Sequence, residues 1–397
     1  MIPSLRQRFN ATWSPEKFSR FLRILESRYG EPTPFRHSET PCFLADELVN
    51  TAARYGSELV EQLLANPEYQ AASRDAIPAA YRVPNEDPVP LFVQADFGLD
   101  AKRNLKLVEI QGFPSLYGYQ LALSDAYGEA YQLDKSLAAL PGGLSRASYE
   151  HLFRRAVVGN HDPQNVVLME IDPRQQKTRH DFTETQRMLG IGVVDARVVV
   201  KKGSRLFYRR GAVDVPIERI YNRVIADELE RRKIELPFDF RDDLEVEWAG
   251  HPNWFFRLSK FSLPYFRHEA APPSLFLSSG TLPDDLAQWV LKPLYSFAGV
   301  GVIVGPSQED IARIPPSERH NYILQRRVEF HPWIETPEGP TKLELRVMYI
   351  WLDKLQPANL IIRMGRGAQM GVDHNKGLGW VGASAAFIGG NYGGEKQ

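Results

Sequence analysis

The sequence is poor in cysteine, has no excess of charge of either sign and contains no long apolar run. The one cysteine among 397 residues, Cys42, cannot form an internal disulfide and excludes a thiol pair or a zinc site built from cysteines. The 48 basic residues nearly balance the 49 acidic ones, so the formal charge is −1. A general binder of nucleic acids or anionic membranes needs an excess of basic residues, which this chain does not have.

The N-terminal residues lack the apolar segment of a secretory signal, and no stretch approaches the roughly 18 apolar residues of a membrane helix. We therefore expect a soluble, cytoplasmic protein with no nucleic-acid or membrane partner. Hydrophobic residues make up 43% and charged residues 24% of the chain, values that are ordinary for folded domains. The length favours two or three domains, each with its own core.

Changes in the hydrophobic pattern divide the chain into four regions, 1–88, 89–150, 151–250 and 251–397. The first region is predicted to be helical. Ser14 and Pro15 provide a helix start, apolar residues follow at helical spacing, and the segment from Ala45 to Leu64 repeats that period. A proline-rich passage, 84–90, closes this region.

The other three regions mix strands with helices. In the second, strands are predicted at 91–97 and 105–110, and a helix at about 120–140. In the third, strands at 165–171, 193–200 and 217–224 alternate with a helix at 182–189, which predicts a small parallel α/β unit. Closely spaced strands are predicted in the last region at 289–293, 300–304, 322–330, 343–351 and 359–364. The fold class is therefore α/β combined with α+β.

The segment Val290–Val304 has the pattern of a hairpin that can fold over phosphate groups. Lys292 ends its first strand and supplies a positive charge, while Gly299 and Gly301 let the backbone approach phosphate oxygens. An ordinary hairpin with an exposed lysine explains the same residues. A dinucleotide-binding fingerprint does not, because its glycines must open a helix, whereas a β-branched run and Pro306 follow here.

A cluster of oxygen-bearing side chains is predicted on the two strands of the second region. Glu109 and Gln111 are two residues apart on one strand and share a face, and Asp96 on the neighbouring strand can join them. Such hard oxygen ligands suit a Mg²⁺ ion that bridges nucleotide phosphates. A solvated polar face is the alternative interpretation, but the apolar residues around the pair indicate a partly buried strand end.

A third cluster lies downstream of the lysine hairpin. Glu344 and Arg346 share a strand face, Arg363 follows on another strand, and Asn375 lies in a glycine-rich stretch. Phosphate or substrate contact is one interpretation of these residues. An exposed cross-strand ion pair, which contributes little to stability, explains Glu344 and Arg346 equally well.

Two residues of the third region have similarly divided interpretations. Arg223 contacts a substrate carboxylate or forms a structural ion pair with Asp227 or Glu228. His180 is expected to be a surface histidine at a helix start rather than a general base. The nine histidines form no His-x-x-x-His pair, and no Gly-x-Ser-x-Gly elbow is present.

Taken together, these segments resemble the ATP-grasp superfamily, in which two lysines and a hinge segment hold ATP between two α+β subdomains. The matching order is Lys260, Lys292-Pro-x-x-Ser-x-x-Gly-x-Gly-Val, Tyr322-Ile-Leu-Gln325, Glu344-x-Arg346, Arg363 and Asn375. The oxygen cluster, with Asp96 and Glu109-Ile-Gln111, precedes the lysines instead of following them. This inverted order resembles the circularly permuted branch, which contains eukaryotic-type glutathione synthetase and the glutathionylspermidine synthase group.

The resemblance covers residues 90–390 and implies ATP and Mg²⁺ as cofactors. It implies that ATP would be bound by Lys260, Lys292, Ser296, Gly299, Gly301 and Gln325, the last at the adenine edge. Mg²⁺ would be held by Asp96, Glu109 and Gln111. Arg346 and Arg363 would touch phosphate or an acylphosphate as catalytic residues, and the substrate would be contacted by Arg223 and Asn375. The parallel α/β unit would be the substrate domain.

The activity implied by the resemblance is the ligation of a carboxylate to an amine or thiol through an acylphosphate, with release of ADP and phosphate. Such phosphoryl transfer needs positioning and charge neutralisation rather than a nucleophilic side chain. This chain departs from the family at three positions. Gln94 stands where the family commonly has an arginine, and Gln111 stands where asparagine is expected. Ser296 occupies about the position where the permuted branch commonly has a further metal-binding glutamate. Gln94 and Gln111 motivate an alternative, a degenerate ATP-grasp protein that binds nucleotide as a sensor or scaffold. An unrelated α/β protein is the third possibility.

Overall fold

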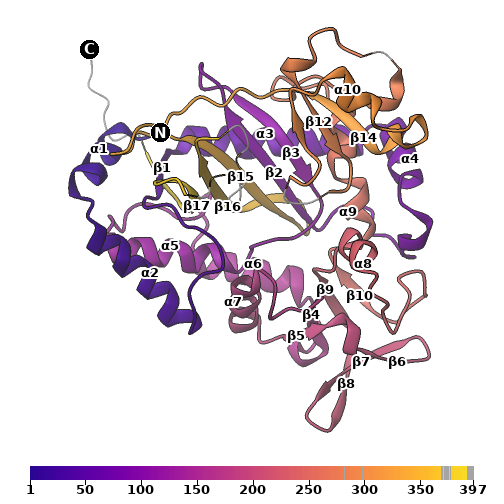
Figure 1. Cartoon of the computed structure of the whole chain (residues 1–397). Helices are drawn as coiled ribbons and strands as arrows, with labels where there is room; N and C mark the ends of the chain where they lie inside the picture. Colours follow the sequence, from indigo (N-terminus) through magenta and orange to yellow (C-terminus); the bar gives the residue numbers. More distant parts are fainter. Residues whose placement is uncertain (281, 297–298, 368–369, 371–374, 376, 391–397) are drawn as a thin grey trace.

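The computed structural model describes residues 1–280, 282–296, 299–367, 370, 375 and 377–390, and its strands form five sheets (Figure 1). Parallel and antiparallel sheets occur together with helices, so the predicted mixed class is confirmed. Among the helices of the described residues, none is both long and apolar enough to cross a membrane.

The central sheet has five antiparallel strands in the order β17-β16-β15-β2-β3. The strands are β2 (Phe92–Leu99), β3 (Leu105–Gln111), β15 (Lys342–Trp351), β16 (Leu355–Gly365) and β17 (Gly382–Ser384). The strands predicted at 91–97, 105–110, 343–351 and 359–364 are therefore confirmed. Two segments far apart in the sequence, 92–111 and 342–384, build this one sheet.

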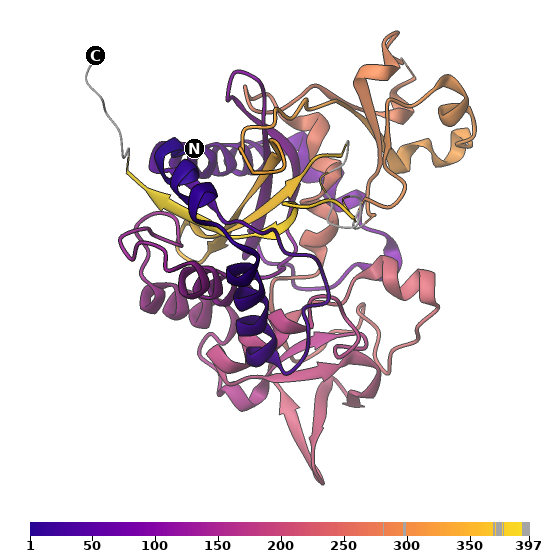
Figure 2. The same cartoon turned by 60° about the vertical axis from the view of Figure 1, so that its left-hand side comes forward.

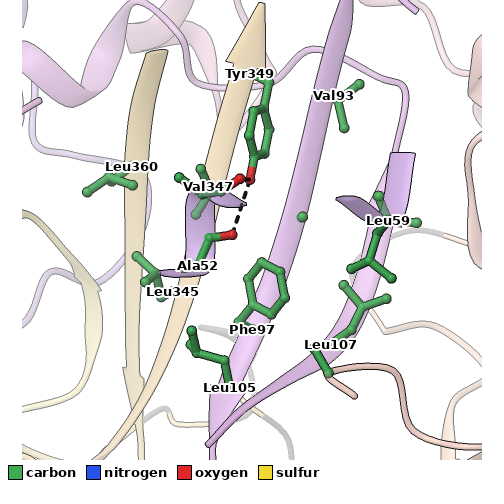
Figure 3. Packing of buried hydrophobic residues seen from close by; sticks show 14 of the residues in the cluster. Ala52, Leu59, Val93, Phe97, Leu105, Leu107, Leu345, Val347, Tyr349 and Leu360 are labelled. Carbon is green, nitrogen blue, oxygen red and sulfur yellow. Dashed lines mark hydrogen bonds between the residues drawn. The ribbon is translucent and has the colours of Figure 1, made fainter. Parts of the chain in front are cut away.

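One face of the central sheet is largely apolar and packs on α3 (Asp46–Leu64). Alternate residues of β15, including Leu345, Val347 and Tyr349, point to this face because side chains alternate along a strand. Tyr349 reaches from β15 to α3, where its hydroxyl lies 2.8 Å from the carbonyl of Ala53. The same hydroxyl lies 3.3 Å from the carbonyl of Ala52 (Figure 3).

The opposite face of the central sheet is divided into two halves. Around Phe92 and Met348 it is apolar and is covered by α5 (Tyr119–Tyr131) and α6 (Arg146–Val157). The other half carries charged side chains. Helix α5 is shorter than the predicted helix at 120–140, because Gln132 adopts a left-handed φ of 52° and ends it.

The third region contains the predicted parallel sheet, with strand order β10-β9-β4-β5 and helix α7 (Arg179–Leu189) between β4 and β5. Its strands are β4 (Val166–Glu170), β5 (Gly192–Asp195), β9 (Arg219–Asn222) and β10 (Glu247–Ala249). The chain goes from β4 to β5 on one side and returns to β9 on the other, so the winding direction reverses between β4 and β9.

The single strand predicted at 193–200 is wrong, because β5 stops at Asp195. The Asp195 carboxylate accepts a hydrogen bond from the backbone N–H of Arg197 and starts a 3₁₀ turn. A three-stranded antiparallel sheet follows, made of β6 (Val200–Lys202), β7 (Arg205–Arg210) and β8 (Val213–Ile217). Its β7–β8 hairpin projects from the body of the molecule (Figures 1 and 2).

A small antiparallel sheet, which we call the upper sheet, lies beside β3 (Figure 1). It has the order β11-β14-β12-β13, with β11 (Ser274–Phe276), β12 (Trp289–Pro293), β13 (Ile303–Val304) and β14 (Tyr322–Arg326). Phe297 and Ala298, in the loop between β12 and β13, lie outside the described residues. The segment before β11 contacts the free edge of β3, where Leu107 donates its backbone N–H to the carbonyl of Ala270.

The N-terminal region is helical except for β1 (Cys42–Ala45), which pairs with β18 (Ala386–Gly389). Ser14 caps α2 as predicted by accepting a hydrogen bond from the backbone N–H of Lys17. The α-helices here are α1 (Pro3–Thr12), α2 (Pro15–Tyr29), α3 and α4 (Pro67–Asp75). The other short α-helices are α8 (Ala226–Arg232), α9 (Asn253–Arg257) and α10 (Gln308–Ala312).

We predict that Gly56→Ala destabilises the protein by about 1–3 kcal/mol, the usual cost of overpacking a core. A β-carbon on Gly56 of α3 would overlap the buried hydroxyl of Tyr349. The matched control is Gly128→Ala in α5, where a β-carbon meets no neighbour within 4 Å and helix propensity favours alanine. Urea unfolding of the two variants checks the prediction, and equal stabilities would contradict it.

Candidate active site

The charged half of the central sheet gathers side chains from four strands on one face. Asp96 lies opposite Arg346 on one side and Glu109 on the other, while Gln94 lies opposite Gln111. Directly paired residues of antiparallel strands point to the same face. The residues that this face brings together are Gln94, Asp96, Glu109, Gln111, Glu344, Arg346 and Arg363. The sheet register therefore unites all residues predicted to hold metal or to act in catalysis.

Asp96 is held by two arginines. Arg346 donates to both of its carboxylate oxygens, with Nη2 2.6 Å from Oδ2, and Arg363 Nη1 lies 3.1 Å from Oδ2. Burial opposes ionisation, but the two guanidinium groups outweigh it and hold the pKa of Asp96 below its usual value. Both oxygens of this buried carboxylate are therefore engaged in ion pairs.

Glu344 and Arg346, which the sequence places on one strand face, do not pair with each other and are both buried. Glu344 is bonded by Arg363, which also reaches Asp96. Burial raises the pKa of Glu344, against the opposing charge of Arg363. The alternative interpretation of Glu344 and Arg346 as an exposed cross-strand ion pair is therefore wrong. These are buried ion pairs, whose disruption is costly because a charge would be left without its partner.

Glu109 and Gln111 line a small cavity of about 20 Å³ together with Lys260 and Ser296. Lys260 Nζ lies 3.4 Å from Glu109 Oε1 and donates to the carbonyl of Ser296 at 2.7 Å. The Ser296 hydroxyl is buried, and in the described part of the chain it has no hydrogen-bond partner. Lys260 begins a 3₁₀ segment and is buried, so the alternative of a solvated helical lysine is wrong.

Lys292 joins the upper sheet to β3. Its Nζ donates to Gln325 Oε1 at 2.5 Å and to the carbonyl of Val108 at 2.9 Å, and Gln325 Nε2 donates to the carbonyl of Leu107 at 3.3 Å. Val108 is an extra residue in β3, since Asp96 faces Glu109 while the next residue of β2 faces Leu107. Burial lowers the pKa of Lys292 to about 8, although the charge of Glu109 opposes this.

The glycines of the predicted phosphate loop have left-handed backbones, with φ of 76° at Gly299 and 75° at Gly301. A β-carbon on Gly301 would also lie 2.8 Å from Pro293. Asn375, expected to contact substrate, is buried and accepts hydrogen bonds from the backbone N–H groups of Arg366 and Gly367 at 2.9 and 3.2 Å. It therefore holds the end of β16, and the neighbouring Lys376 lies outside the described residues.

Arg223 follows β9 of the parallel sheet. Its Nη1 is 2.8 Å from Asp181 Oδ2, and its guanidinium lies over the rings of Phe182 and Phe113. The expected ion pair with Glu228 is wrong, since Glu228 pairs with Arg232. The side chain of Asp227, the other partner considered, lies outside the described part of the structure. The Nε of Arg223 is buried, and no partner for it is found among the described residues.

Glu170, which the sequence analysis missed, ends β4 beside the end of β9 that leads into Arg223. It is 4% exposed, its Oε1 accepts a hydrogen bond from the N–H of Ile171, and burial raises its pKa to about 8 despite Arg223. Ligands of open parallel sheets bind where the winding direction reverses, at the carboxyl ends of the strands. The strand β4 was predicted, but only the strand order places Glu170 at this point.

His180 was expected at the surface, and this expectation is wrong. The residue is 2% exposed, its ring stacks on Tyr29 with centroids 4.0 Å apart, and Nε2 lies 3.1 Å from Glu31. It packs α7 against α2. Burial lowers the pKa of His180, although the hydrogen bond and charge of Glu31 oppose this.

The oxygen donors of the cavity fit a Mg²⁺ ion in part. Glu109 and Gln111 present a carboxylate and an amide to the same space, and Mg²⁺ bound to nucleotides commonly uses one or two protein ligands plus phosphates and water. The third predicted ligand, Asp96, has both carboxylate oxygens engaged by Arg346 and Arg363. Among the described residues, no group of three or more His, Cys, Asp or Glu side chains is arranged to hold a metal.

Comparison with known proteins assigns no family to the chain. No protein-family model matches the sequence, and no curated protein matches it.

We predict that Asp96→Asn destabilises the protein by about 3–5 kcal/mol, because it leaves Arg346 and Arg363 buried without their counter-ion. The control is Asp125→Asn, which alters an exposed carboxylate paired with Arg146 and is expected to cost less than about 1 kcal/mol. Urea unfolding at neutral pH measures both. Similar losses in the two variants would contradict the structural role of the Asp96 ion pairs.

We also predict a pH-dependent gain in stability for Glu170→Gln. Since the folded pKa of Glu170 is about 8 against an ordinary 4.5, folding favours the protonated acid, and the unfolding free energy falls as pH rises between these values. The variant loses this dependence, so it gains up to about 1.4 kcal/mol per pH unit over the natural protein. Urea unfolding at pH 5 and pH 8 tests this, with Glu150→Gln on the exposed face of α6 as the control. A gain that does not grow with pH would refute it.

Proposed function

We propose that the chain is an ATP- and Mg²⁺-dependent ligase of the circularly permuted ATP-grasp type, which joins a carboxylate to an amine or thiol through an acylphosphate. One observation carries the proposal. Lys260 and Lys292, from separate segments, converge with the carboxylate of Glu109 between the central sheet and the upper sheet. Two cations and an oxygen ligand at one such junction are what a metal–triphosphate complex needs.

The hydrogen bonds of the two lysines support this proposal. Lys260 donates to the carbonyl of Ser296, and Lys292 to the carbonyl of Val108 and the amide of Gln325. Phosphate oxygens form stronger, charge-assisted hydrogen bonds with ammonium groups than these neutral acceptors do. A triphosphate would therefore displace the neutral acceptors at both lysines.

The arginines divide into two roles under this proposal. Arg346 is buried and is held by Asp96, so it would act as scaffold. Arg363 has a quarter of its side chain exposed and would approach a phosphoryl group during acylphosphate formation. Glu109 and Gln111 would hold Mg²⁺, which supplies neutralisation of the phosphate charge when it is bound.

The substrate side of the proposal rests on the parallel sheet. Glu170 and Arg223 lie where the winding direction reverses, and Arg223 has an N–H without a partner among the described residues. A guanidinium and a carboxyl group at this place would recognise the carboxylate and the amine of small-molecule substrates. We propose such molecules as the partners of a cytoplasmic enzyme.

A nucleotide-binding protein without ligase activity is the second candidate function. The observation that favours it is the engagement of both Asp96 oxygens by Arg346 and Arg363, which leaves a reduced set of cation ligands. This candidate keeps the lysines as nucleotide ligands but releases no ADP.

We predict that ATP binds and that its affinity rises with excess Mg²⁺ compared with EDTA, as measured by calorimetric titration. Lys292→Met should weaken ATP binding by about 10-fold or more, since a hydrogen bond to a charged group contributes roughly 1.5–3 kcal/mol. The control, Lys102→Met, changes an exposed lysine of the β2–β3 turn and should leave binding unchanged.

Two outcomes separate the candidates. Stoichiometric ADP release with at least one acid and amine of a broad panel supports the ligase. ATP binding with no turnover across the panel favours the second candidate, and no ATP binding at all contradicts both.

A further inference from the structure

Gln94 is fully buried in the charged face, and its amide makes three hydrogen bonds. Its Oε1 accepts from Arg346 Nη1 at 2.8 Å and from Gln111 Nε2 at 2.6 Å. Its Nε2 donates to the carbonyl of Ser115 at 2.8 Å. Both ends of this side chain are therefore fixed by neighbours of known hydrogen-bonding character.

The orientation of Gln94 follows from what those neighbours can do. A guanidinium only donates hydrogen bonds, so the group facing Arg346 must be the oxygen of Gln94. The carbonyl of Ser115 only accepts, so the group facing it must be the nitrogen. Arg346 itself is fixed by its double bond to Asp96. The chemistry of the neighbours thus sets the direction of the Gln94 amide.

The hydrogen bond to Gln94 sets the orientation of the Gln111 amide. Because it faces the oxygen of Gln94, it must present its own nitrogen there, and its oxygen is turned away. Gln111 lines the same cavity as Glu109, which precedes it by two residues on one face of β3, whereas Gln94 does not line that cavity. Among the described residues, no hydrogen-bond partner is recorded for Gln111 Oε1.

We propose that Gln94 is a positioning residue for the cation of this site. It turns the amide of Gln111 so that the oxygen, and not the N–H₂ group, accompanies the carboxylate of Glu109. A free amide presents either end, and its N–H₂ end repels a cation. A series of hydrogen bonds thus runs from Asp96 through Arg346 and Gln94 to Gln111. It fixes which end of the Gln111 amide faces the cation. The identity of the cation as Mg²⁺ rests on the proposed function, while the orientation rests on the hydrogen bonds alone.

The test compares the Mg²⁺ enhancement of ATP affinity, defined as the ratio of the ATP dissociation constants in EDTA and in excess Mg²⁺. In Gln94→Leu this ratio should fall by about 10-fold, the lower end of effects from groups that orient metal ligands, while ATP affinity in EDTA stays unchanged. Gln111→Leu should reduce the ratio to a similar extent. The double variant should lose no more than either single variant, because Gln94 acts through Gln111.

Two further variants guard against a purely structural effect. Gln94→Glu loses the hydrogen bond to the carbonyl of Ser115 but retains an acceptor for Arg346 and Gln111, so it should keep the enhancement. If Gln94→Leu does not fold, Gln94→Asn replaces it, since its shorter amide retains polarity but does not reach Gln111. Equal losses of ATP affinity with and without Mg²⁺, or additive losses in the double variant, would overturn the positioning role.

The outcomes also separate this inference from the proposed function. If the natural protein does not bind ATP, the proposed function fails. ATP binding without any Mg²⁺ enhancement retains the nucleotide site and overturns the cation site with its positioning residue. Enhancement that persists in Gln94→Leu overturns the role of Gln94 alone.

Discussion

The buried ion pair between Asp96 and Arg346 is the constraint on which the site depends. It joins β2 to β15 across 250 positions of sequence and sets which residues of the two strands lie opposite each other. A slip of one residue would turn every side chain of a strand to the other sheet face. The register of β2 against β15 therefore determines both the charged half of one sheet face and the apolar packing of the other face on α3. Removing the pair would disturb both.

The polar groups of the site satisfy one another through this pair. Asp96 fixes the position of Arg346, and Arg346 in turn orients the amide of Gln94. Arg363 donates hydrogen bonds to both Asp96 and Glu344. Buried polar groups are stable only when each has a partner, so the loss of one member would destabilise the whole cluster. On its outer side, Glu109 and Gln111 of β3 meet the lysines and the cavity. The inner part is held by ion pairs, and the outer part borders the cavity.

Local pattern in the sequence was enough to predict much of this arrangement. The strands that carry the site were predicted from local sequence pattern. The alternation of side chains along a strand then put Glu109 with Gln111 and Glu344 with Arg346 on common faces. The partners of these residues depend on strand pairing between distant segments, which local pattern does not encode. For that reason the Asp96–Arg346 pair, the extra residue Val108 and the position of Glu170 emerged only from the structure. His180 was misplaced because its cover comes from α2, far away in sequence.

The pairing of β2 with β15 also has a consequence for synthesis of the chain. Strands β2 and β3 and helix α3 are complete long before residue 342 is made, yet the second edge of β2 finds its partner only in β15. The parallel sheet, by contrast, draws its strands from residues 166–249 and closes within one stretch of the nascent chain. Non-local strand pairing is slow because loop closure must precede it. The β2–β3 hairpin therefore leaves the ribosome before β15 does, and the edge of β2 that pairs with β15 stays unpaired while the parallel domain folds.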